Sequence, residues 1–272
     1  MTYARWLSSV GRVTEAAHLP VEMFGAAARP DEPAADMRTV PLSVQGAAEA
    51  VPALVWLPTG VSGPRPVVLI GHGAGGHKAA PIVERTASRL ARLGCAALSI
   101  DCPYHGDRTP PDEVGLSAAE RRDRLGLDAW RERNALAVGQ AVADWRAALD
   151  AAQLLDEVGP GPAGYFGLSL GCRFGLPLVA AEDRISAAVL GLYGHSSDPG
   201  SAMAAEAARR ITIPVLFLLQ WDDELYDRTG GLVLFELLAS ARKRLHANPG
   251  RHLDVPPAEM EYATAFLCEH LS

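Results

Sequence analysis

A Gly-x-Ser-x-Gly motif at residues 167–171 is the stretch of this chain whose residue types and spacing point most directly to chemistry. It follows the apolar run 163–166 and precedes a helix-compatible segment from Leu170 to Ala180. A sharp turn between a strand and a helix lifts a serine hydroxyl above the sheet edge, and flanking glycines leave room for the crossing backbone. The sequence therefore predicts that Ser169 is a nucleophile rather than an ordinary turn residue.

A serine nucleophile needs a base to take its proton and an acid to orient that base. The chain offers candidates in the order serine, acid, histidine. Asp222 and Asp223 come shortly after the apolar run 213–219, and His252 follows the last strand that we predict, at 244–247. Either aspartate could instead cap a helix or stabilise a turn. We predict that His252 is the base and that one of the two aspartates is the acid.

These segments resemble the α/β-hydrolase superfamily, in particular its dienelactone-hydrolase-like and esterase branches, from about Arg38 to the C-terminus. Members of those branches carry a G-x-x-D-x-x-V-P segment after the penultimate strand. Matching that segment to residues 220–227 implies that Asp223 is the acid. Asp222 stays the alternative, because Gln220 stands where the family usually has glycine.

Two loops extend the resemblance. The final loop of the family usually reads G-x-H, which residues 250–252 match, so the resemblance implies His252 as the base. The loop 72–77, with the sequence HGAGGH, resembles the family's H-G-x-G motif. It implies that the backbone N–H groups of Ala74 and Leu170 form an oxyanion hole, with the glycines allowing the backbone to turn them into the site.

Aromatic and histidine side chains follow three of the predicted strands, at the edge where open α/β sheets bind ligands. Tyr104 and His105 follow the strand at 96–100, Tyr193 and His195 follow the strand at 187–192, and Trp221 adjoins the predicted acid. Each of the five lines the substrate pocket or is an ordinary loop residue.

The composition favours a small-molecule partner. A formal charge of -7 and a pI near 5.6 oppose attraction to nucleic acid. Apolar runs are too short for a membrane span, and the first residues lack the apolar core of a signal peptide, so we expect a soluble, cytoplasmic protein. The loop 72–77 lacks nucleotide-binding glycine patterns, and no carboxylate or cysteine cluster accompanies His72 and His77. We predict neither cofactor nor metal, and the oligomeric state stays open.

The alternation of short apolar runs with longer amphipathic segments predicts one α/β domain, with a mainly parallel, doubly wound sheet flanked by helices. Residues 1–37 read as a lead-in of helix and loop, and 38–272 as the hydrolase domain. Two antiparallel strands are expected first, at 39–44 and 51–57. Further strands are expected at 67–71, 96–100, 164–167, 187–192, 215–219 and 244–247, and helices at 6–20, 80–92, 131–155, 170–180, 229–241 and 257–271.

The charged stretch 107–134 breaks this pattern. Ser117 and Glu120 have the spacing of a capping box that begins a short helix. We interpret the stretch as an insertion that lies over the active site as a lid, or else as a solvated helical excursion.

Together these features predict a serine hydrolase that cleaves a small carboxylic ester through an acyl-enzyme intermediate. A thioesterase, a peptidase or a C–C bond hydrolase would use the same residues. More distant alternatives are a cofactor-free perhydrolase and a protein of this fold that binds a small ligand without catalysis.

Overall fold

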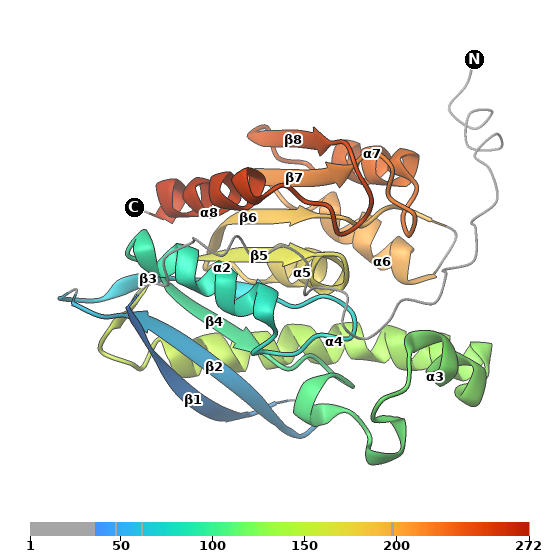
Figure 1. Cartoon of the computed structure of the whole chain (residues 1–272), viewed down its shortest axis with the longest axis horizontal. Coiled ribbons are helices and arrows are strands. Elements are labelled where there is room, and N and C mark those ends of the chain that lie inside the picture. The colour runs from blue at the N-terminus through green and yellow to red at the C-terminus, as the bar shows by residue number, and fades with distance from the viewer. Residues whose placement is uncertain (1–35, 47, 61, 197–198, 272) are drawn as a thin grey trace.

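An eight-stranded sheet forms the centre of the computed structural model, which describes residues 36–46, 48–60, 62–196 and 199–271. The order of the strands is β1-β2-β4-β3-β5-β6-β7-β8 (Figure 1). The strands are β1 (Met37–Gln45), β2 (Ala50–Pro58), β3 (Arg65–Gly71), β4 (Ala96–Ile100), β5 (Val158–Leu168), β6 (Ile185–Gly191), β7 (Val215–Gln220) and β8 (Lys243–Asn248).

The direction of the strands confirms the predicted sheet. β1 pairs antiparallel with β2, and β2 pairs antiparallel with β4, whereas every other neighbouring pair is parallel. β4 and β7 are buried along their whole length, because helices cover both faces of a parallel sheet. β8 lies at one edge and carries two charged residues, Lys243 and Arg244, which protect the edge from pairing with another chain. Because β4, β3, β5, β6, β7 and β8 run parallel, their carboxyl ends lie at the same edge of the sheet.

Helices cover the two faces of the sheet in separate groups (Figure 1). One hydrophobic cluster joins the sheet to α2 and α8, and the other joins it to the remaining large helices. The helices are α2 (Pro81–Arg92), α3 (Ala118–Leu125), α4 (Leu127–Ala152), α5 (Leu170–Ala181), α6 (Pro199–Ala208), α7 (Arg228–Leu237) and α8 (Pro257–Leu271). The arrangement is the doubly wound α/β fold that the sequence predicts.

Three helices differ from the expectations. α6 was not predicted, α4 begins at Leu127 instead of Arg131, and α7 ends at Leu237 instead of Ala241. α6 consists largely of alanine, so its buried face carries little contrast in polarity with its exposed face. The predicted helix at 6–20 lies outside the described residues. In the part of the chain that the structure describes, no helix is long and apolar enough to cross a membrane.

The insertion at 107–134 folds as two short 3-10 turns, α3 and the first turns of α4. Ser117 and Glu120 form the predicted capping box, with each side chain accepting the other residue's backbone N–H. The insertion packs against the loop after β4, where Arg121 donates to the carbonyl of Tyr104 and Arg133 lies over the Tyr104 ring. Its role as a lid stays a prediction.

Candidate active site

Ser169 occupies the sharp turn between β5 and α5, with a backbone φ of 58°. Positive φ is strained for a residue with a side chain, and such strain concentrates at functional sites. Its N–H donates to the carbonyl of Gly191 on the neighbouring strand, which helps to hold the turn. The side chain is nearly buried, with 5% of the residue exposed.

The two glycines of the motif are required by close backbone contacts. A Cβ on Gly171 would lie 2.6 Å from the carbonyl oxygen of Gly71 on β3, and one on Gly167 would lie 2.6 Å from the carbonyl oxygen of Gly171. The buried hydroxyl of Tyr165 donates to that same Gly171 carbonyl at 2.7 Å. The start of α5 is thus clamped against β3 and β5, which fixes the position of Ser169.

His252 and Asp223 complete a continuous chain of hydrogen bonds with Ser169. The Nε2 atom of His252 lies 3.0 Å from Ser169 Oγ, and its Nδ1 atom lies 2.7 Å from Asp223 Oδ2. The His252 residue is 1% exposed and the Asp223 side chain 3% exposed, so water is largely excluded from both bonds. With Nδ1–H donated to the carboxylate, Nε2 can accept the proton of the serine hydroxyl.

The structure separates the two candidate acids. The second oxygen of Asp223 accepts the backbone N–H groups of Leu225 and Tyr226, at 2.8 and 2.9 Å. Asp222 is exposed and turns toward Gly250, whose N–H it accepts at 3.3 Å. Only Asp223 of the two contacts the imidazole of His252.

Sequence reasoning missed two residues beside His252. Glu224 accepts the backbone N–H of His252 at 2.9 Å and forms an ion pair with Arg251 at 3.2 Å. The ring of Tyr226 packs against the imidazole with centroids 5.8 Å apart. Both residues lie in the loop that carries Asp223. Their closeness in sequence to the predicted acid is the one signal that could have indicated them.

The predicted oxyanion donors follow neighbouring strands. Gly71 at the end of β3 pairs with Gly167 at the end of β5, so the loop with Ala74 and the N-terminus of α5 emerge side by side. Leu170 is the first residue of α5, and N–H groups in the first turn of a helix have no acceptor within the helix. Ala74 sits in the exposed turn between Gly73 and Gly76.

His72 ties the loop after β3 to the loop after β4. Its Nε2 accepts the N–H of Cys102 at 3.1 Å, so the proton resides on Nδ1, which donates to the carbonyl of Gly73 at 2.9 Å. Both ring nitrogens are therefore engaged in positioning backbone. Among the described residues no group of three or more His, Cys, Asp or Glu side chains could hold a metal ion.

Two histidines, His72 and His105, make the protein sensitive to acid; their ring centroids lie 5.2 Å apart. Burial lowers the pKa of His72, and it lowers the pKa of His105 to about 3. In the unfolded chain a histidine takes up a proton near pH 6.5. Between pH 6.5 and the lowered pKa of His105 in the folded protein, this residue binds more protons in the unfolded chain than in the folded protein. Stability is therefore lost as the pH falls below about 6.5.

We expect the His105→Gln variant to lose less stability in acid than the parent protein. Between pH 7 and pH 5 the parent should lose about 2 kcal/mol more of its free energy of unfolding than the variant. Urea unfolding of both proteins at the two pH values measures this difference. Equal losses would mean that the His105 imidazole becomes protonated inside the folded protein. His270→Gln, on the last turn of α8, is the control.

The five predicted pocket residues all follow strands at the carboxyl edge, but their surroundings differ. The Tyr193 ring is buried and packs against that of Tyr226, whereas His195 lies 3.0 Å from the hydroxyl of Ser201. Trp221 is 47% exposed and is covered on one face by the guanidinium of Arg228. The Tyr104 ring packs under the guanidinium of Arg133, and the His105 ring lies beside that of His72.

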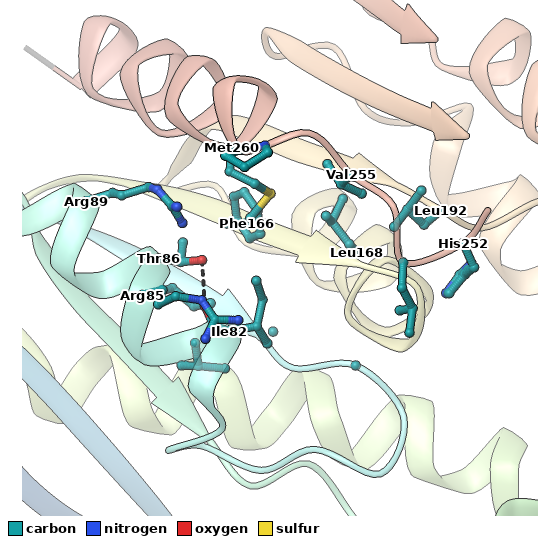
Figure 2. Close-up of a pocket in the computed structure, with 16 residues that line it drawn as sticks. Ile82, Arg85, Thr86, Arg89, Phe166, Leu168, Leu192, His252, Val255 and Met260 are labelled. Carbon is teal, nitrogen blue, oxygen red and sulfur yellow. Dashed lines mark hydrogen bonds between the residues drawn. The ribbon is translucent and has the colours of Figure 1, made fainter. Parts of the chain in front are cut away.

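A cavity of about 90 Å³ opens beside His252 and is lined by none of these five residues. It runs between α2 and α8, over the ends of β3, β5 and β6 (Figure 2). Sequence reasoning missed it because its walls come from helices that are distant along the chain and meet only in the folded protein.

Comparisons with known proteins identify the family of this chain. A family model described as the dienelactone hydrolase family matches residues 51–241. The chain belongs to the dienelactone hydrolase family. This hydrolase has no significant match among curated proteins.

Solved structures of similar proteins include esterases. A cold-adapted esterase from an Arctic intertidal metagenomic library, in complex with PEG, is 36% identical, with 90% of this chain and 99% of that chain covered and a TM-score of 0.75. An acetyl xylan esterase from Paenibacillus sp. R4 is 18% identical over 100% of both chains, with a TM-score of 0.67. A dienelactone hydrolase from Anabaena variabilis is 21% identical over 86% of this chain and 96% of its own, with a TM-score of 0.56. The two more distant structures share the α/β-hydrolase fold.

Proposed function

We propose that this hydrolase cleaves small carboxylic esters through an acyl-enzyme intermediate on Ser169. The observation that carries the proposal is the unbroken hydrogen-bonded chain from Ser169 Oγ through the imidazole of His252 to Asp223 Oδ2. The 36% identity with an esterase supports ester cleavage over the other acyl substrates.

In the first step Ser169 Oγ attacks the acyl carbon while His252 Nε2 takes the hydroxyl proton. Asp223 accepts Nδ1–H throughout and stabilises the imidazolium that forms. The negative charge that develops on the carbonyl oxygen is stabilised by the N–H groups of Ala74 and Leu170 and by the positive end of α5. His252 then gives its proton to the departing alkoxide.

In the second step a water molecule attacks the acyl group on Ser169, and His252 takes a proton from that water. The same oxyanion donors stabilise the second tetrahedral intermediate, and collapse of this intermediate returns the proton to Ser169. All of these steps use groups of the chain itself together with water.

A fluorophosphonate probe tests the proposal, because it reacts covalently only with an activated serine. We expect peptide mapping to locate the label on Ser169, and 4-nitrophenyl acetate to give a burst of nitrophenol as the acyl-enzyme accumulates. Ser169→Ala should abolish both signals. A folded parent protein that takes up no label at Ser169 would overturn the proposal.

A further inference from the structure

The cavity beside His252 is lined mainly by hydrocarbon. The sheet contributes Phe166 and Leu168, the loop after β6 contributes Leu192, and the facing helices contribute Ile82 and Met260. Figure 2 shows His252, Leu168 and Leu192 gathered at one end of it, with Ile82 and Met260 further along on opposite sides. His252 connects this end of the cavity to the proposed nucleophile, because its Nε2 atom lies 3.0 Å from Ser169 Oγ.

An apolar cavity of this kind binds a hydrocarbon chain, because water is released from both surfaces when the chain enters. We propose that the cavity holds the acyl chain of the substrate, so that this hydrolase acts on esters of apolar acids longer than acetic acid. The inference rests on the proposed function and names the class of acid that it cleaves.

The order of the two chemical steps favours the acyl chain over the alcohol as the occupant. The alcohol must leave after the first step, whereas the acyl group stays bonded to Ser169 until water attacks it. His252 lines one end of the cavity and, as the proposed base, needs an open side for the departing alcohol and the incoming water. A group held deep between α2 and α8 suits the part of the substrate that stays attached.

The far end of the cavity sets an upper limit to the chain length. Arg85, Thr86 and Arg89, on successive turns of α2, line that end (Figure 2). Packing a methyl terminus against guanidinium groups removes water from the charges without giving them a new partner, which is unfavourable. The rate should therefore rise with acyl length and then fall once the chain reaches these residues.

Substitution of Ile82 tests the inference, because this residue lines the cavity but is only partly buried. We expect Ile82→Phe to lower the ratio of kcat/KM for 4-nitrophenyl hexanoate to that for 4-nitrophenyl acetate by at least about tenfold. Ile82→Ala should shift the optimum to longer acyl chains. Ile213→Phe is the matched control, because Ile213 is also partly buried but packs in the core on the opposite face of the sheet. It should leave the ratio as in the parent.

A second series, acetate esters of alcohols of increasing length, distinguishes the acyl chain from the alcohol. The inference is overturned if the Ile82 variants alter only this alcohol series, or if their acyl-length profile matches that of the parent. Circular dichroism and thermal melting of each variant verify the fold. Fluorophosphonate labelling of Ser169 distinguishes failure of this inference from failure of the proposed function. If Ser169 is labelled but the acyl-length profile of the Ile82 variants is unchanged, only the acyl pocket is refuted. If Ser169 of the parent protein is not labelled, the proposed function is refuted.

Discussion

We expect Asp223→Asn to lower kcat for 4-nitrophenyl esters by about 10⁴-fold, and Asp222→Asn to change it by less than about threefold. The difference follows from the hydrogen bonds of the two carboxylates. One oxygen of Asp223 accepts two backbone N–H groups and the other faces His252 Nδ1. An asparagine there keeps its carbonyl oxygen on the two N–H groups, so its amide group must face the imidazole.

That amide group donates to Nδ1 and thereby forces the imidazole proton onto Nε2. The Nε2 atom, 3.0 Å from Ser169 Oγ, then carries a hydrogen and has no lone pair for the serine proton. The defect is one of tautomer and not of folding, so the Asp223→Asn protein should melt close to the parent temperature. Its activity should recover in part at high pH, where the serine hydroxyl loses its proton more readily.

Steady-state kinetics of the two variants across pH 6 to 10 measure the difference. Asp222 is exposed and contacts the backbone of Gly250 at 3.3 Å, so its substitution affects a surface hydrogen bond. If Asp222→Asn lost activity and Asp223→Asn retained it, Asp222 would be the acid and the assignment of Asp223 would be wrong.

The sheet could be predicted closely from sequence because its signals are local. A strand covered on both faces is a short apolar run, and β4 has the predicted limits of 96–100. The loops after parallel strands meet at one edge, so the motif around Ser169, the acidic pair after β7 and the histidine after β8 could be brought together from their order alone.

The surroundings of the site could not be predicted in this way. Whether Trp221 faces a pocket or the solvent depends on the rotation of its side chain, and here Arg228 holds it at the surface. The cavity combines side chains of α2 and α8, such as Ile82 and Met260, that nearly 180 residues separate in sequence. Their meeting depends on how two helices pack on one face of the sheet, for which the chain carries no local signal.

A buried ion pair links this edge of the sheet to α4. The Arg108 side chain is 2% exposed and donates to Asp144 Oδ2 at 2.8 Å, and the Asp144 side chain is fully buried. Arg108 also donates to the backbone carbonyl of Asp101, the residue before the Cys102 whose N–H holds His72. Through these contacts the pair supports the loop that carries the predicted oxyanion donor.

We expect Asp144→Ala to lower the free energy of unfolding by about 3 kcal/mol, because the buried guanidinium of Arg108 would lose its fully buried counter-charge. It would keep only Glu49, whose side chain is 54% exposed and lies 2.8 Å from Arg108 Nε. Urea unfolding at pH 7 measures the loss. Glu206→Ala is the control, since Glu206 and Arg209 form an exposed helical pair at 3.7 Å, which contributes less than about 1 kcal/mol.

The double variant Arg108→Met/Asp144→Leu separates charge from packing. If the loss in Asp144→Ala comes from the buried charge of Arg108, replacing both residues with apolar ones should restore much of the stability, even though no ion pair remains. A double variant as unstable as the single one would instead assign the loss to packing around α4. In the first case the double variant should still be less active than the parent, because no guanidinium holds the Asp101 carbonyl and the backbone that positions His72 loosens.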